Sequence, residues 1–140
     1  MKKIIASVLL VALCLTLAAC GAYTDSDVLW EDAHYTEDTE LGEGAKTVVV
    51  TVTAGEKSVV FTIKTDEAIL GDALMAHGLV EGEAGQFGLY VKKVNGITAD
   101  YDVDQSYWGF YKGGDYMMTG IDSTPVTGDA SYEFVYTPAS

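Results

Sequence analysis

The sequence predicts an α+β domain, with a mostly antiparallel sheet of five to six strands and one helix packed on one face of it. Three observations lead to this class. Apolar side chains recur at every second position in several short segments, as they do on half-buried strands. A segment near residue 70 instead has helical spacing. Glycine, asparagine and aspartate, which favour turns, separate these segments.

The first predicted elements are two strands joined in a hairpin. Valines recur at every second position over residues 48–52. The alternation resumes with Val59, Phe61 and Ile63, after the run AGEK at residues 54–57. A run of four residues with a glycine suits a turn between two antiparallel strands. We therefore expect a hairpin with one strongly apolar face.

A helix is expected after this hairpin. Its apolar face would consist of Ile69, Leu70, Ala73, Leu74 and His77. Thr65 or Asp66 is expected to cap the beginning of the helix, because such side chains accept hydrogen bonds from the free backbone N–H groups there. Gly78 is expected to end the helix in the left-handed conformation.

The remaining elements are strands separated by turns. Residues 81–86 are expected to form a polar loop. Strands are expected at residues 89–94, 107–111, 116–118 and 132–136. Asn95 and Gly96 suit a tight turn, as do residues 112–115. Two strands, one helix and then three or four strands resemble a β-grasp fold.

The first twenty residues predict a lipoprotein signal peptide. Lys2 and Lys3 precede an apolar run at residues 4–17, which is typical of a secretory signal. The run LAAC at residues 17–20 resembles the bacterial lipobox, in which the cysteine is acylated and the peptide before it is removed. Cys20 is therefore expected to anchor the protein to the extracytoplasmic side of the cell membrane. The alternative is an ordinary signal peptide that leaves Cys20 as an incidental thiol.

The sequence divides into three parts. Residues 1–19 are the expected signal peptide. Residues 20–45 are the lipidated cysteine and an acidic flexible tether, because acids are frequent and lysine is absent there. Residues 46–140 are expected to form one domain. Cys14 and Cys20, the two cysteines of the chain, lie outside it, so the domain is expected to have neither disulfides nor thiolate metal sites.

The chain is strongly acidic. It has 21 Asp and Glu residues against 8 Lys and Arg residues, and its formal net charge is −13. Nucleic acids and anionic lipid headgroups are bound by basic surfaces, so this composition argues against both as partners. Cations, neutral small molecules and cell-surface proteins remain as partners. The charge is explained equally well by solubility.

Four short motifs follow one another in an informative order. They are DAL at residues 72–74, VNGI at 94–97, YWGFYKGG at 107–114, and GD at 128–129 before a tyrosine-rich strand. This order resembles a bacterial domain family of unknown function that is related to the C-terminal domain of transcobalamin and intrinsic factor. The resemblance implies that residues 46–140 are a transcobalamin-like C-terminal domain. It also implies a β-grasp-like fold, typical of secreted and lipid-anchored proteins, with no enzymatic activity.

The resemblance further implies a surface that contacts a ligand. In transcobalamin-like proteins this domain covers one face of a corrinoid, whose other face rests on a large α-helical barrel. The sequence predicts no such barrel, so the chain would supply only part of a corrinoid site. A fold does not determine a function by itself, and other planar small molecules are also candidates.

The aromatic run at residues 107–118 is the candidate binding surface. The candidate ligand-binding residues are Tyr107, Trp108, Tyr111, Tyr116 and Met117. Alternation along a strand would bury Trp108 and Phe110 and leave the three tyrosines exposed. Exposed tyrosines stack well on planar ligands. The alternative is that these aromatic residues only stabilise the hairpin through cross-strand pairs.

Three alternating acids form a candidate metal site. Asp100, Asp102 and Asp104 resemble the opening of an EF-hand loop, in which carboxylate oxygens bind calcium. The rest of that motif is missing, since Gln105 and Tyr111 stand where its glycine and its bidentate glutamate belong. In a loop the three acids could converge on calcium, whereas on a strand they would only share a solvated face.

The residues give no indication of an enzyme. His77 is the one histidine of residues 46–140, and we find neither a Ser-His-Asp nor a paired-histidine spacing. Two functions therefore remain open. One is a cell-surface module that binds a small molecule with its aromatic hairpin. The other is a structural or adhesion domain, stabilised by calcium or another metal, that contacts the cell wall or other proteins.

Overall fold

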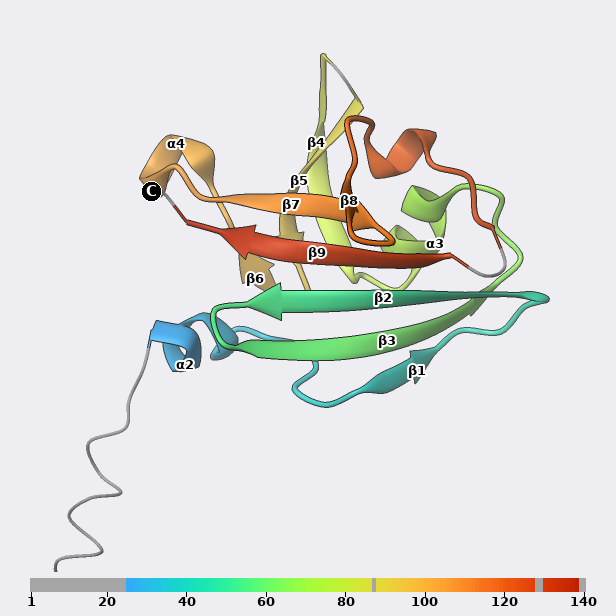
Figure 1. Ribbon diagram of the computed structural model, residues 1–140, viewed down its shortest axis with the longest axis horizontal. Coiled ribbons are helices and arrows are strands. Elements are labelled where there is room, and N and C mark those ends of the chain that lie inside the picture. Colours follow the sequence, from blue (N-terminus) through green and yellow to red (C-terminus); the bar gives the residue numbers. More distant parts are fainter. Residues whose placement is uncertain (1–24, 87, 128–129, 139–140) are drawn as a thin grey trace, which may run out of the picture.

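The computed structural model describes residues 25–86, 88–127 and 130–138 (Figure 1). The expected signal peptide of residues 1–19 and the expected lipidation site, Cys20, lie outside the described residues. In the part that is described, no helix has the length and apolar character needed to cross a membrane. The described residues form two sheets and a few short helices. The predicted α+β class is therefore confirmed.

The larger sheet has six strands, in the order β1-β3-β2-β9-β7-β8 (Figure 1). They are β1 (Thr39–Leu41), β3 (Lys57–Thr65), β2 (Lys46–Ala54), β9 (Ser131–Thr137), β7 (Tyr107–Lys112) and β8 (Asp115–Tyr116). The hairpin of β2 and β3 is antiparallel, as predicted. β2 and β9 pair in parallel at the centre, as do β1 and β3 at one side. The central pair thus joins strands that lie far apart in the sequence.

A second layer packs over one face of this sheet. It contains helix α3 (Leu70–Ala76) and a smaller antiparallel sheet of β4 (Val80–Gly85), β5 (Gly88–Val94) and β6 (Ile97–Thr98). In Figure 1 these elements lie behind β7, β9 and β2. The predicted helix on one face is confirmed, and the small sheet lies beside it in the same layer.

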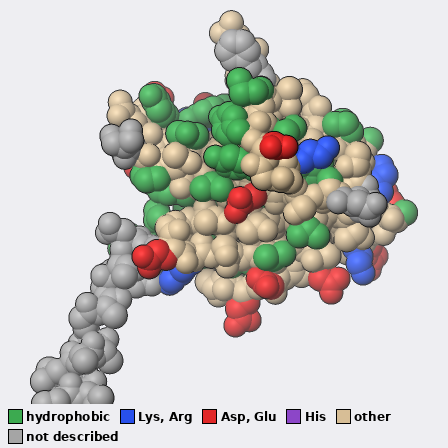
Figure 2. All heavy atoms as spheres, viewed as in Figure 1, with side chains coloured by type: hydrophobic (Ala, Val, Ile, Leu, Met, Phe, Trp, Pro, Cys, Tyr) green, Lys and Arg blue, Asp and Glu red, His purple; other side chains and the backbone are tan. Residues whose placement is uncertain are grey.

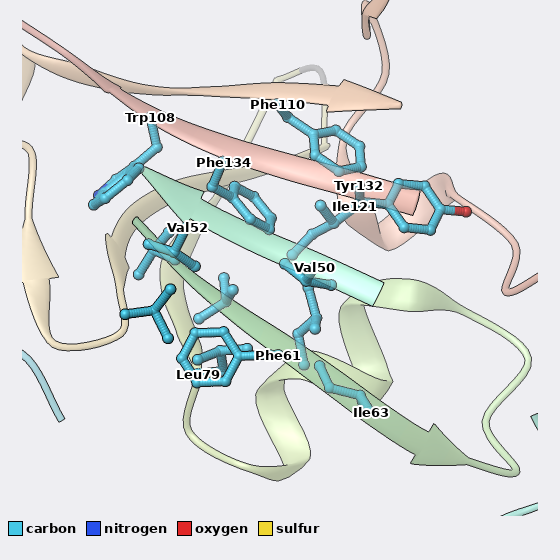
Figure 3. Packing of buried hydrophobic residues seen from close by; sticks show 14 of the residues in the cluster. Val50, Val52, Phe61, Ile63, Leu79, Trp108, Phe110, Ile121, Tyr132 and Phe134 are labelled. Carbon is cyan, nitrogen blue, oxygen red and sulfur yellow. The ribbon is translucent and has the colours of Figure 1, made fainter. Parts of the chain in front are cut away.

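The hydrophobic core lies between these two layers. Side chains of the large sheet and of the second layer belong to one cluster of buried residues (Figure 3). Val50, Phe61 and Phe134 project into it from three neighbouring strands and are 0% exposed. Val49 and Val60 point to the opposite face and are half-buried. The alternation predicted from the sequence therefore determines which face of the sheet the core covers.

The segment before β2 differs from the flexible tether expected for residues 20–45. Its described part, residues 25–45, contains α2 (Asp25–Trp30) and β1, which pairs with β3. Trp30 is 7% exposed, and its indole Nε1 donates a hydrogen bond of 2.9 Å to the backbone oxygen of Ala54. The acidic composition of the segment predicted disorder and gave no sign that Trp30 would be buried. Burial of this side chain removes apolar area from water, which stabilises the segment against the folded domain.

Asn95 holds the same segment through its side chain. Its Oδ1 accepts a hydrogen bond from the backbone N–H of Tyr35 at 2.9 Å, and its Nδ2 donates one to the Tyr35 carbonyl at 2.8 Å. The ring of Tyr35 packs edge-on against Phe61. Asn95 is 0% exposed and has a φ of +52°, which fits the tight turn predicted with Gly96. The side-chain amide of Asn95 therefore satisfies both backbone groups of Tyr35, as the backbone of a paired strand does in a sheet.

Helix α3 begins later than predicted. The expected caps, Thr65 and Asp66, lie before the first residue of the helix, Leu70, and accept hydrogen bonds from the backbone N–H groups of Glu67 and Ala45. The N-cap is Ile69, which makes no side-chain hydrogen bond to the helix. At the other end, Gly78 has a φ of +65°, as predicted.

Residues 81–86 were expected to form a loop, but most of them belong to β4, which pairs with β5. Side chains along this strand after its first residue are exposed. Glu81 and Glu83 form ion pairs with Lys93 and Lys92, at 3.7 and 3.5 Å. A strand can pair through its backbone without having an apolar face. The polar composition of β4 therefore did not indicate a strand.

Candidate ligand-binding site

A groove of about 340 Å³ opens between β5 and the β7–β8 hairpin. This aromatic groove is lined by Gly85, Gln86, Gly88, Leu89, Tyr90, Val91, Tyr107, Trp108, Phe110, Tyr116, Met117, Met118, Thr119, Gly120, Ile121 and Phe134. Figure 2 shows hydrophobic side chains gathered around β7, β8 and the nearby helix α4 (Tyr101–Asp104). The lining comes from both sheets, so the groove exists only when the two layers are packed together.

The floor of the aromatic groove is held by the core. Trp108 and Phe110 are 7% and 9% exposed, as the alternation of β7 predicts. The indole Nε1 of Trp108 donates a hydrogen bond of 3.1 Å to the backbone oxygen of Ile97. Phe110 stacks on Phe134 with 5.2 Å between the ring centroids (Figure 3). These contacts fix the floor without a ligand, as is usual for small-molecule sites.

The rim of the aromatic groove is exposed. Tyr107 is 37% exposed, Tyr116 is 54% exposed, and Met118, beyond the end of β8, is 87% exposed. Tyr90 joins them from β5. Large apolar side chains that gather at one hollow, instead of being scattered singly, are typical of interaction sites.

Four of the five candidate ligand-binding residues line this groove, namely Tyr107, Trp108, Tyr116 and Met117. Tyr111 does not. It is half-buried and packs edge-on against Tyr116, its cross-strand neighbour, with 5.4 Å between the ring centroids. Tyr111 therefore supports one rim residue from outside the groove.

Sequence reasoning missed the side of the groove that β5 forms, and also residues 119–121. Leu89, Tyr90 and Val91 line this side. Their alternation correctly indicated a strand, but it does not say which strand lies opposite. The approach of β5 to β7 joins the small sheet to the large one, and no local pattern marks that contact.

The three candidate metal ligands lie on and beside α4. Asp100 is the N-cap, and its Oδ1 accepts a hydrogen bond of 3.0 Å from the backbone N–H of Asp102. Asp104 accepts hydrogen bonds from the backbone N–H and the hydroxyl of Ser106, which lower the pKa of its carboxyl. Among the described residues, no three His, Cys, Asp or Glu side chains are grouped to hold a metal ion. The alternating acids thus form a helical turn rather than a strand or an open loop.

A second hollow adjoins the aromatic groove. This tyrosine hollow, of about 370 Å³, is lined by Tyr90, Asp100, Tyr101, Asp102 and Tyr107. Tyr90 and Tyr107 line both cavities, so the two are neighbours. Burial raises the pKa of Tyr90, Lys92 lowers it, and the two aspartates raise it further. Charges of both signs therefore act on the hydroxyl of Tyr90.

Comparison with known proteins gives two solved structures of interest. No protein-family model and no curated protein matches the chain. A candidate metal-binding protein from Ruminococcus gnavus ATCC 29149 is 36% identical in sequence, with a TM-score of 0.63, over 69% of this chain and 100% of that one. The chain belongs to the family of this Ruminococcus protein.

The family shares its fold with haptocorrin, a member of the transcobalamin family whose structure is known in complex with Cbi. The identity is 16% and the TM-score is 0.51, over 71% of this chain. The chain spans 27% of the haptocorrin chain. At this identity the likeness shows the fold alone, and it supports the predicted resemblance to a transcobalamin-type domain at that level.

Proposed function

We propose that the domain is a non-enzymatic module that binds a flat, largely apolar small molecule in the aromatic groove. The observation that carries the proposal is the contrast between its floor and its rim. Trp108 and Phe110 are fixed in the core, whereas Tyr107 and Tyr116 expose ring surface beside them. A ligand placed there would cover this exposed aromatic area without first reorganising the floor.

The size of the groove bears on the class of ligand. Its volume of about 340 Å³ lies near the lower end of the usual range for small-molecule sites. A corrinoid-like molecule would be contacted over one part of its surface only. Haptocorrin, which shares the fold, is known in complex with Cbi, and a corrinoid is therefore one of the flat ligands to test.

A titration with flat ligands tests the proposal. We expect a neutral flat dye such as Nile red, or a corrinoid, to bind and to change the tryptophan fluorescence, because Trp108 lines the groove whereas Trp30 does not. Met118→Ala and Tyr116→Ala are each expected to weaken binding by about fivefold or more, because each removes exposed apolar area at the rim. Met75→Ala is the matched control, since Met75 is also exposed but lies on α3 and does not line the groove. Equal effects of Met118→Ala and Met75→Ala would place the ligand elsewhere.

Metal binding is a second candidate function, because the Ruminococcus relative is a candidate metal-binding protein. Asp100 and Asp102 are the residues to test, because both line the tyrosine hollow. Calcium at millimolar concentration is expected to raise the midpoint of thermal unfolding, since a ligand that prefers the folded state stabilises it. Asp100→Ala combined with Asp102→Ala is expected to remove this increment.

The control for the calcium experiment is a pair of acids outside the site. Glu43→Ala combined with Asp72→Ala changes the net charge by the same amount and should leave the increment unchanged. A calcium response that survives the loss of Asp100 and Asp102 would exclude these residues as ligands.

The proposal places the module at the cell surface, held by a lipid on Cys20. It rests on the two lysines, the apolar run and the LAAC motif of residues 1–20. Cys20→Ser is expected to move the processed protein from the membrane fraction to the soluble fraction, because the cysteine is the proposed acyl acceptor. Cell fractionation followed by a high-salt wash measures this. If the processed variant stayed with the membranes after the wash, the lipid assignment would be wrong.

A further inference from the structure

The tyrosine hollow has a chemistry of its own. Its walls are the side chains of Tyr90, Tyr101 and Tyr107, which are 39%, 53% and 37% exposed. They come from three separate elements, namely β5, α4 and β7. The remaining two lining residues, Asp100 and Asp102, are both acidic. The cavity therefore combines aromatic side chains with acidic ones, and its lining includes no basic residue.

The two acids keep their charge available. Neither forms an ion pair with any of the residues that the structure describes. One carboxylate oxygen of Asp100 accepts a hydrogen bond from the backbone N–H of Asp102, and the other carboxylate oxygen takes no part in this bond. Lys92, the cation whose charge acts on Tyr90, is itself paired with Glu83 at 3.5 Å. Glu83 raises the pKa of Lys92 most, burial lowers it, and both aspartates raise it further.

This combination selects one class of ligand. Aromatic faces attract a cation electrostatically within about 6 Å of the ring centroid, and carboxylates nearby add to the attraction. A small hydrated metal ion gains little from apolar ring faces, because it needs several oxygen ligands close together. A methylated ammonium group carries a diffuse charge and presents apolar methyl groups, so it matches both the rings and the acids.

We propose that the tyrosine hollow binds a quaternary ammonium group, held by the faces of Tyr90, Tyr101 and Tyr107 and by the charge of Asp100 and Asp102. The site lies beside the aromatic groove and shares Tyr90 and Tyr107 with it, whereas Tyr101 and the two aspartates line the hollow alone. The acidic surface of the chain, with a net charge of −13, raises the local concentration of such cations.

Choline and its neutral analogue 3,3-dimethylbutan-1-ol are the probes, because they have nearly the same shape and differ in charge. The full chain, in a nonionic detergent and at low salt, is titrated with each while the tyrosine ring resonances are followed by NMR. We expect choline to shift the resonances of Tyr90, Tyr101 and Tyr107 in a saturable way. The neutral alcohol is expected to bind at least about fivefold more weakly.

Two exposed residues give variants that should preserve the fold. Tyr101→Leu keeps apolar bulk but removes one ring, and is expected to weaken choline binding by about threefold or more, whereas Tyr101→Phe keeps the ring and most of the affinity. Asp102→Asn is expected to weaken binding and to reduce its dependence on salt. The matched control is Tyr116→Leu, since Tyr116 is 54% exposed and lines only the aromatic groove.

The outcomes separate this site from the aromatic groove. Loss of choline binding in Tyr101→Leu but not in Tyr116→Leu supports the tyrosine hollow. Equal binding of choline and the neutral alcohol would overturn the proposal, as would a choline affinity that Tyr101→Leu leaves unchanged. A response to calcium without any response to choline would also overturn it. Failure of flat ligands to bind the groove would leave the choline result as it stands.

Discussion

Replacement of Trp108 by alanine is expected to lower the free energy of unfolding by about 3–5 kcal/mol, as other large-to-small core substitutions do. Trp108 is 7% exposed and packs edge-on against Tyr136. Its indole also donates a hydrogen bond to the backbone oxygen of Ile97 in the small sheet. The substitution would therefore leave a cavity and an unpaired acceptor where the two sheets meet. Chemical denaturation of the purified domain measures the change.

Tyr111→Ala is the matched control for this experiment. Tyr111 lies on the same strand but faces away from the core, and it is half-buried. Its loss is expected to cost about 1 kcal/mol, as substitutions outside the core commonly do. A larger loss for Tyr111 than for Trp108 would mean that β7 presents its other face to the core.

Asn95→Ala is the second substitution with a large expected effect, about 3 kcal/mol. It would leave the backbone N–H and carbonyl of Tyr35 without partners, and each unpaired buried group costs about 1–3 kcal/mol. Alanine is also less tolerant than asparagine of the φ of +52° at this position. Thermal and chemical unfolding measure the loss.

Hydrogen exchange of residues 33–41 shows whether the effect is local. Exchange there is expected to become faster in Asn95→Ala, because the substitution releases the segment from the turn. Thr39→Ala is a suitable control, since the Thr39 hydroxyl makes only an exposed hydrogen bond to the carbonyl of Glu37. Unchanged exchange in Asn95→Ala would contradict the view that this amide holds the segment in place.

Local patterns predicted the elements that have a buried face or a special turn. The β2–β3 hairpin, β7 and β9 all follow from alternation, because one side of each strand must be apolar to cover the core. The turn at Asn95 and Gly96 follows from its residue types, and both residues have positive φ angles. In these elements the residue types of a short segment are enough to indicate the secondary structure that the segment forms.

The sequence could not predict features that depend on distant partners. β4 is polar because its side chains are solvated, and β1 is too short to show a period. Asp66, which local rules assign to a helix cap, instead bonds the backbone of Ala45. The lining of the aromatic groove was predicted in part for the same reason, since Trp108 was identified from its strand whereas Tyr90, on another sheet, was not.

The position of β9 in the sheet has a consequence for the timing of folding. β9 lies between β2 and β7, and its parallel pairing with β2 spans most of the domain. Until residues 131–137 have been synthesised, the strands on either side of it have no common neighbour, and the core between them stays open. Contacts of such long sequence separation form late, because closing a long loop costs conformational entropy before the contacts between its ends stabilise the fold. A nascent chain of this topology would therefore lack its complete core through most of its synthesis.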